Sequence, residues 1–207
     1  MRSIAPVLFA VLLCLAAPAS MAAATDTSFR DAQGHRVQQL RLVVEAPVAK
    51  VWAAFTTDAG FTRWAAPVAH VTLANDGMIE ASYLTTAEIG DPGNIRNRIV
   101  AYVPERLLVL QNAHAPAKGP FKQTVIDQIR TIVEFEDLGD GRTRIVESGV
   151  GYGEGADFDS MYAHFRDGNA EEFEMLARSF VSGPVDWTKQ AQSAQASVRR
   201  PASKAKE

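Results

Sequence analysis

A strand gives way to a helix within residues 44–55, which read VEAPVAKVWAAF. The β-branched residues that precede Glu45 favour an extended strand over residues 37–45. Pro47 suits the first position of a helix, because the backbone N–H that it lacks would have no partner there. The stretch therefore predicts a strand that is followed directly by a short amphipathic helix. The apolar residues of that helix recur at the i, i+3, i+4 and i+7 spacing of one face: Val48, Val51, Trp52 and Phe55.

A run of strands is predicted after this helix. Thr57 can cap a second short helix, which ends near Trp64. Asn75-Asp76-Gly77 and Gly139-Asp140-Gly141 are typical of tight turns between antiparallel strands, because these residues tolerate positive φ angles. Together with residues 37–45, six further segments make a sheet of about seven strands with mainly local connections. The six segments are residues 71–74, 78–85, 98–103, 107–112, 125–138 and 143–150.

A long helix is predicted after the last strand. Asp157 is suited to its N-cap, Gly168 interrupts it, and Gly183-Pro184 is a stop signal. A sheet with one apolar face and a helix with one apolar stripe cover each other when the curved sheet wraps around the helix. The sequence thus predicts an α+β domain with a cavity between helix and sheet. The apolar residues expected on one face of the helix are Phe158, Tyr162, Phe165, Phe173, Leu176 and Phe180.

The two ends of the chain are not expected to belong to this domain. Residues 4–17 form an apolar run that is too short to span a bilayer of about 30 Å. Arg2 precedes this run, and Ala22-Ala23-Ala24 provides a signal-peptidase pattern, so residues 1–24 are expected to be a cleaved signal peptide rather than a membrane anchor. We expect a periplasmic or secreted protein without stable membrane insertion. The remaining expected segments are a lead-in at 25–36, the domain at 37–187 and a disordered basic tail at 188–207.

Composition and charge exclude several classes of protein. The chain has 207 residues, of which 47% are hydrophobic and 22% charged, as in ordinary soluble globular proteins. Its single cysteine, Cys14, excludes a disulfide framework and a cysteine-based zinc site. Residues 25–187 contain 15 Lys and Arg against 23 Asp and Glu, and this acidic balance argues against nucleic-acid binding.

Several of these segments resemble the SRPBCC superfamily, the START and pollen-allergen-like helix-grip fold. They are residues 44–55, Trp64, the LGDGRTR sequence at 138–144 and the closing helix from Gly168 to Gly183. Within the superfamily, they look like the domain of activators of the heat shock protein 90 ATPase. The resemblance spans residues 37–187. It implies a helix-grip fold, in which a curved antiparallel sheet of about seven strands wraps around a long C-terminal helix and two short helices follow the first strand.

The resemblance implies several functions, because the superfamily contains lipid carriers, polyketide cyclases or dehydrases and co-chaperone domains. The chaperone that the activators serve is intracellular, so an exported protein would not meet it. We therefore take the fold and the cavity from the resemblance, and not the co-chaperone activity.

Most motifs for cofactors and metals do not fit the predicted fold. Residues 151–156, GYGEGA, match a dinucleotide-binding pattern, but no second parallel strand follows the helix. We expect a flexible loop at the mouth of the cavity instead. The histidines lack the spacing of metal ligands, so neither a metal nor a cofactor is expected. They are His35, His70, His114 and His164.

The candidate site residues depend on which face of each strand points inward. Alternation places Glu147 on the same face as Thr143 and Ile145, either in the cavity or in water. Inside, Glu147 would have a raised pKa and could act as a general acid or base, with His164 as a second candidate. Arg98 and Gln111 carry the same ambiguity as Glu147. The full set of predicted ligand-binding residues is Trp64, Tyr83, Arg98, Gln111, Glu147, Tyr162 and Phe165.

Three functions remain compatible with the sequence. The favoured one is the binding of a small hydrophobic or amphipathic ligand in the cavity. The second is a polyketide cyclase/dehydrase-like or hydrolase-like enzyme that uses Glu147 and His164. The third is a protein-interaction domain without a ligand.

Overall fold

The computed structural model of the chain describes residues 23–116 and 119–192. The expected signal peptide lies outside these residues apart from Ala23 and Ala24, and so does most of the expected tail. Residues 187–192 are helical, although the disordered tail was expected to begin at Thr188. This helical segment is held in place by two hydrogen bonds to the region after α2: the Val185 N–H to the Arg63 carbonyl, 2.9 Å, and the Trp187 indole to the Thr62 carbonyl, 2.7 Å.

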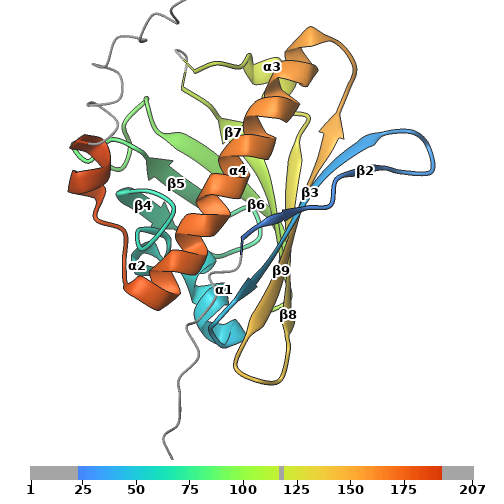
Figure 1. Ribbon diagram of the computed structural model, residues 1–207. Coiled ribbons are helices and arrows are strands. Elements are labelled where there is room, and N and C mark those ends of the chain that lie inside the picture. Colours follow the sequence, from blue (N-terminus) through green and yellow to red (C-terminus); the bar gives the residue numbers. More distant parts are fainter. Residues whose placement is uncertain (1–22, 117–118, 193–207) are drawn as a thin grey trace, which may run out of the picture.

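The strands form one antiparallel sheet (Figure 1). Its order is β1-β3-β9-β8-β7-β6-β5-β4, and β2 also pairs with β3. The predicted helix-grip sheet of about seven strands is confirmed, with two short strands added in the lead-in. The strands are β1 (Thr25–Asp26), β2 (Phe29–Arg30), β3 (Arg36–Val44), β4 (Val68–Val71), β5 (Met78–Ser82), β6 (Ile95–Val103), β7 (Leu107–His114), β8 (Arg130–Asp137) and β9 (Thr143–Tyr152).

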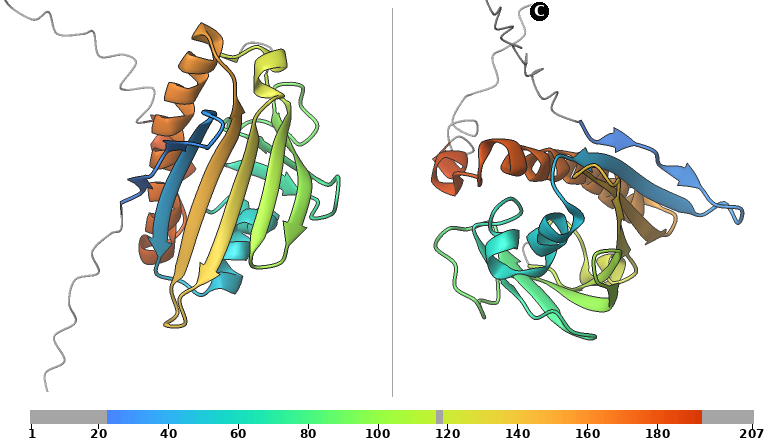
Figure 2. Two further views of the ribbon diagram at one scale, coloured as in Figure 1. Left: turned by 90° about the vertical axis from the view of Figure 1, so that its right-hand side faces the viewer. Right: turned by 90° about the horizontal axis from the view of Figure 1, so that it is seen from below.

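Besides the helical residues 187–192, the described part of the chain contains the helices α1 (Val48–Thr56), α2 (Asp58–Phe61), α3 (Gln123–Ile126) and α4 (Ala156–Ser182). Viewed from below, the sheet is strongly curved, and α4 runs along its open side while α1 and α2 lie at one end (Figure 2). The small α3 lies near the opposite end of α4 (Figure 1). The long helix is therefore gripped by the sheet as predicted.

Several predicted strands have other bounds in the structure: β4 covers residues 68–71 where 71–74 were expected, and β5 ends at Ser82 where the strand was expected to reach residue 85. The largest difference is at the start of β8. Residues 125–138 were expected to be extended, but 123–126 form α3 and β8 begins only at Arg130. Val125, Ile126 and Ile129 are all buried together in one apolar cluster, which a helical turn allows and an alternating strand does not. Apolar content alone misled the prediction here, because the spacing of these residues is helical.

The glycine-rich segment after this region is packed more closely than a flexible loop. Gly151 still belongs to β9 and has a φ angle of +95°. A Cβ atom at Gly151 would lie 2.0 Å from the carbonyl oxygen of Gln128, so only glycine fits. The flexible loop expected at residues 151–156 is thus reduced to the short connection between Tyr152 and α4.

The core is divided into two apolar clusters. The larger lies around α1 and the C-terminal half of α4 and includes Val51, Phe55, Ile145, Phe173 and Leu176. The smaller lies around α3 and the N-terminal half of α4, and consists of Val125, Ile126, Ile129, Tyr152 and Met161. The two clusters are separated by the cavity described below.

Candidate functional site

An inner cavity of about 450 Å³ lies between α4 and the concave face of the sheet. Members of both apolar clusters line it, so it occupies the gap between them. Most of its wall is apolar and rich in aromatic rings, as in sites that bind small organic molecules. The apolar lining consists of Phe55, Phe61, Trp64, Ile95, Leu110, Ala115, Pro116, Pro120, Phe121, Ile126, Ile129, Val133 and Phe165.

A small polar group interrupts this wall. Glu147 enters it from β9, and Asn169 and Glu172 enter it from α4. The Asn169 amide donates a hydrogen bond to Oε1 of Glu147 at 2.5 Å. The Tyr83 hydroxyl donates to Oε1 of Glu172 at 2.7 Å. Two carboxyl groups therefore share one apolar cavity, and each is held by a neutral donor.

Glu147 points inward because of the alternation of β9. Thr143 and Ile145 lie on the same face of this strand, and both are 0% exposed. The apolar side chain of Ile145 fixes this face against the core, and Glu147 follows two residues later. Of the two orientations that the sequence allowed, the inward one is therefore confirmed.

Burial disfavours the charged form of both carboxyl groups. It raises the pKa of Glu147 to about 8, and the nearby charge of Glu172 adds to the increase while the hydrogen bond from Asn169 opposes it. Burial also raises the pKa of Glu172, against the hydrogen bond from Tyr83. The pKa of Tyr83 is raised by burial of its hydroxyl and by Glu172, although 60% of the residue surface is exposed. The Tyr83 ring is thus at the surface, and its hydroxyl reaches inward.

Five of the predicted site residues line the cavity: Trp64, Tyr83, Glu147, His164 and Phe165. The indole N–H of Trp64 donates to the Ala54 carbonyl at 2.9 Å, which fixes the ring in the wall. His164 is exposed, and its ring lies edge-on to Phe121, with 5.1 Å between the ring centroids. His164 is therefore placed at the rim of the cavity, and Glu147 in its interior.

Three of the predicted site residues do not line the cavity. Arg98 and Gln111 are paired across β6 and β7, and the Arg98 guanidinium donates to Oε1 of Gln111 at 2.5 Å on the outer face of the sheet. Their neighbours Asn97 and Leu110 occupy the inward positions instead. The prediction required Arg98 and Gln111 to point toward the cavity, but the alternation of these two strands turns them to the outer face.

Tyr162, the third of these residues, packs beside the cavity. Its ring lies edge-on to Tyr152, with centroids 5.0 Å apart, and the Arg36 guanidinium is 5.3 Å from the ring centroid. The Tyr162 carbonyl accepts a hydrogen bond from the buried side chain of Gln38 at 3.0 Å. Tyr162 therefore supports the wall instead of forming it.

The sequence prediction missed the polar residues that α4 contributes. Asn169 and Glu172 follow Phe165 by four and seven residues, which is the spacing of one helical face. This spacing indicates that Asn169 and Glu172 share the face of Phe165, but the prediction for this face rests on the apolar residues alone. Asn97, Asn112 and Thr131, which also line the cavity, lie on strands whose phase was not determined by the sequence.

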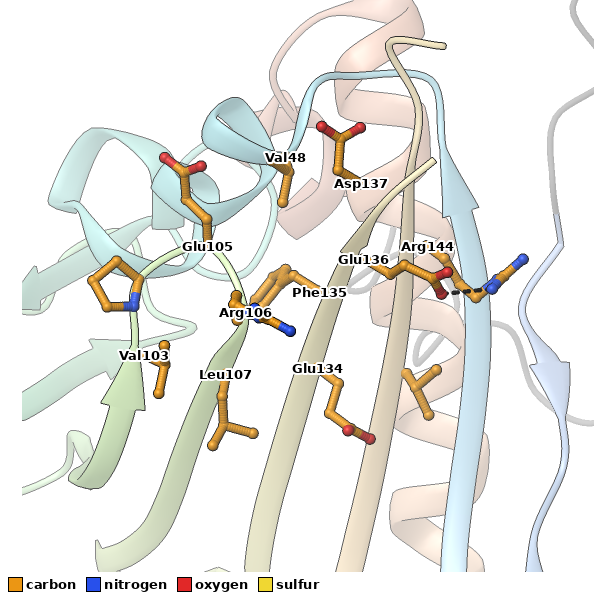
Figure 3. A pocket seen from close by; sticks show the side chains of 12 residues that line it. Val48, Val103, Glu105, Arg106, Leu107, Glu134, Phe135, Glu136, Asp137 and Arg144 are labelled. Atoms are coloured by element: carbon orange, nitrogen blue, oxygen red, sulfur yellow. Dashed lines mark hydrogen bonds and ion pairs between the residues drawn. The ribbon is translucent and has the colours of Figure 1, made fainter. Parts of the chain in front are cut away.

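A second hollow, of about 1010 Å³, lies at the end of the sheet where the β6–β7 turn meets β8 and β9 (Figure 3). Its walls include exposed charged residues such as Glu105, Arg106 and Glu134, and an ion pair joins Glu136 to Arg144 at 2.5 Å. The charged side chains of this groove are exposed, whereas the walls of the inner cavity are mostly apolar. The inner cavity is therefore the candidate site.

The described residues also bear on metal binding and on membrane insertion. Within residues 23–116 and 119–192, no group of three or more His, Cys, Asp or Glu side chains is arranged to hold a metal ion. Among the helices of this described part, none combines the length and the hydrophobicity that crossing a bilayer requires.

The family model of the Activator of Hsp90 ATPase homolog 1-like proteins (AHSA1) matches residues 45–180, from the end of β3 to the last turns of α4. The chain belongs to the AHSA1 family. This match covers every residue that lines the cavity except Gln38, and both of its carboxyl groups. It agrees with the resemblance to the SRPBCC superfamily. No curated protein matches the chain.

Solved structures share the fold of this AHSA1-family protein. The Aha1 dimer from Colwellia psychrerythraea is 18% identical with a TM-score of 0.55, and the match covers 71% of this chain and 97% of that one. CalU16 from Micromonospora echinospora is 16% identical with a TM-score of 0.53, covering 87% of this chain and 100% of that one. A conserved protein of unknown function from Enterococcus faecalis is 12% identical with a TM-score of 0.54, covering 84% and 90%. At these identities the likeness is one of fold.

Proposed function

We propose that this AHSA1-family protein is exported and binds a small hydrophobic or amphipathic ligand in the inner cavity. The observation that carries the proposal is the cavity of about 450 Å³ with aromatic walls. That volume lies within the range of roughly 300–1,000 Å³ found for sites of small molecules. The signal-peptide pattern at residues 1–24 supports export.

The cavity also carries an energetic argument. Protein interiors are normally packed to the density of organic crystals, and a space between two core clusters forfeits the contacts that bulkier side chains would supply. Packing contacts are missing at Gly168, which lines the cavity from the middle of α4. A Cβ atom at this position would meet nothing within 4 Å. A ligand in this space would supply the missing contacts.

Dye binding tests the proposal. We expect N-phenyl-1-naphthylamine, an uncharged apolar dye, to bind the purified protein saturably and with enhanced fluorescence. Gly168→Phe should abolish this binding, because the new ring fills the cavity. Gly168→Ala is the matched control and should keep it. Absence of saturable binding, or binding that Gly168→Phe leaves unchanged while circular dichroism shows a folded protein, would overturn the proposal.

General acid chemistry is a second candidate function, because the Glu147 pKa of about 8 keeps a proton on this carboxyl group at neutral pH. Glu147 could donate that proton to a ligand bound in the cavity. His164 is less suited to assist it, since it lies exposed at the rim. The Glu147→Gln variant separates the two functions: it would abolish turnover of a substrate but leave dye binding intact.

A further inference from the structure

The two carboxyl groups of the cavity come from different elements. Glu147 comes from β9 and Glu172 from α4, and both line the same cavity. Each accepts a hydrogen bond from a neutral donor, and neither has an ion-pair partner among the described residues. Ionising both groups in an apolar cavity is costly unless a cation lies between them.

The described lining of the cavity provides no such cation. Within residues 23–116 and 119–192, neither lysine nor arginine lines it, and the one basic residue is His164 at its rim. Arg36 of β3 pairs with Asp159 at 2.5 Å and Arg96 of β6 with Glu80 at 3.3 Å, and neither arginine lines the cavity. The described lining therefore supplies no positive charge for the pair except at His164.

The cavity also contains a hydrogen-bond acceptor that has no donor. The amide of Asn169 serves one oxygen of Glu147, and the hydroxyl of Tyr83 serves one oxygen of Glu172. Oδ1 of Asn112, another lining residue, is buried without a hydrogen-bond partner in the described structure. A protonated amine carries up to three N–H donors and a positive charge, which matches both deficits.

We propose that the ligand is a hydrophobic amine, whose ammonium group lies between Glu147 and Glu172 and whose apolar body lies against Trp64, Phe165 and the other apolar walls. This inference rests on the proposed ligand binding and specifies its chemical class. The aromatic walls add to the preference, because ring faces attract cations. A fatty acid of equal length would bring a third carboxyl group into the same space.

Three probes of equal chain length test the proposal: decylamine, 1-decanol and decanoate. Each is titrated against the protein carrying N-phenyl-1-naphthylamine, and displacement of the dye is measured. We expect decylamine to displace the dye at concentrations about ten- to a hundredfold lower than 1-decanol, the size expected for a hydrogen bond to a charged group. Decanoate should be the weakest of the three.

Isosteric variants assign the preference to the two carboxyl groups. In the Glu147→Gln/Glu172→Gln protein, decylamine should lose its advantage, while 1-decanol should bind as before and thereby report an intact cavity. Glu136→Gln is the matched control, because Glu136 lies exposed on the outer face of β8 beside Arg144. That control should leave the preference for decylamine unchanged.

The pH dependence gives a second readout. Binding of the ammonium ion requires ionised carboxyl groups, so the affinity for decylamine should increase as the pH rises toward 8, with release of a proton to water, while the affinity for 1-decanol stays level. The groups that face Glu147 are Glu172 and Asn169 from α4, Tyr152 of its own strand and, through Glu172, the Tyr83 hydroxyl.

The outcomes separate the two proposals. Equal displacement by all three probes would overturn the amine proposal and leave cavity binding standing. A preference for decylamine that survives in the double variant would also overturn it. Failure of the dye itself to bind would overturn the proposed function. A preference for decylamine that is lost in the Glu147→Gln/Glu172→Gln protein and kept in Glu136→Gln would support the amine proposal and the proposed function.

Discussion

At the scale of the residue, Glu147 shows both the reach and the limit of sequence pattern. Alternation correctly places it with Thr143 and Ile145 on one face of β9. The same rule applied to Arg98 and Gln111 leads to the outer face, since their inward neighbours are Asn97 and Leu110. Alternation shows which residues of a strand share a face. It does not show which of the two faces points toward α4, because that is decided by contacts between elements that are distant in sequence.

Glu147 should make the folded protein less stable as the pH rises. Its pKa is about 8 when folded, compared with an ordinary value of 4.5. Between these values the folded state keeps a proton that the unfolded state has released, so the free energy of unfolding falls by up to about 1.4 kcal/mol per pH unit. The contribution is fully present below the unfolded pKa and is lost as the pH passes through the folded one.

Urea unfolding of the wild type and of Glu147→Gln, from about pH 5 to about pH 8, measures this effect. Glutamine keeps an oxygen for the Asn169 amide but cannot ionise, so the variant should become increasingly more stable than the wild type toward high pH. Titrating groups that do not interact with Glu147 are common to both proteins and cancel in the difference. A difference that stays constant over this range would contradict the prediction.

At the scale of the element, local signals predicted most of the fold and tertiary packing decided the rest. The helix after Pro47 and the hairpin turn at residues 139–141 were predicted correctly, because periodicity and turn chemistry are properties of neighbouring residues. The predicted N-cap of the long helix was wrong: the N-cap of α4 is Gly155, and Asp157 lies in the first turn. The short strands β1 and β2 were missed, since two residues carry no periodicity and these strands exist only through pairing with β3. The start of β8 was displaced by α3, whose buried side chains serve the smaller cluster.

Two glycines should respond in opposite ways to the same added methyl group. Gly168→Ala should stabilise the protein by about 1 kcal/mol, because alanine is the better helix former and the position has open space around it. Gly151→Ala should destabilise it by about 1–3 kcal/mol, because the φ angle of +95° strains the new residue and its Cβ would contact the Gln128 carbonyl. Thermal unfolding of both variants measures the pair. If both substitutions stabilise the protein, or both destabilise it, at least one of these two environments is wrongly described.

At the scale of the whole molecule, the two apolar clusters and the cavity between them are reflected in α4. Its residues Phe158 and Met161 lie in the smaller cluster and Phe173 and Leu176 in the larger one. Between them the helix offers Gly168, Asn169 and Glu172 to the cavity. The apolar stripe of α4 is therefore interrupted where the helix meets the cavity. This interruption is visible in the sequence, so the contribution of α4 to the site could have been predicted as well.

Export should produce a defined mature protein. We expect expression of the full-length gene in a Gram-negative host to yield periplasmic protein that starts at Thr25, the first residue of β1. Intact-mass measurement of the periplasmic fraction checks this, and a variant with Ala22→Asp and Ala24→Asp, which removes the small residues of the cleavage pattern, should stay uncleaved. Full-length protein confined to the cytoplasm would contradict the proposed export.

The open space at Gly168 has a consequence for how this domain can diversify. Every glycine codon is one nucleotide from an alanine codon and one from a valine codon. Both residues are better helix formers than glycine, and they add one or three carbon atoms where a Cβ now meets nothing. Under the proposed function, point mutation at this single codon would therefore shorten the accepted ligand in graded steps, and no step would weaken the helix. Descendants of this gene would then change ligand size before any other residue of the site changes.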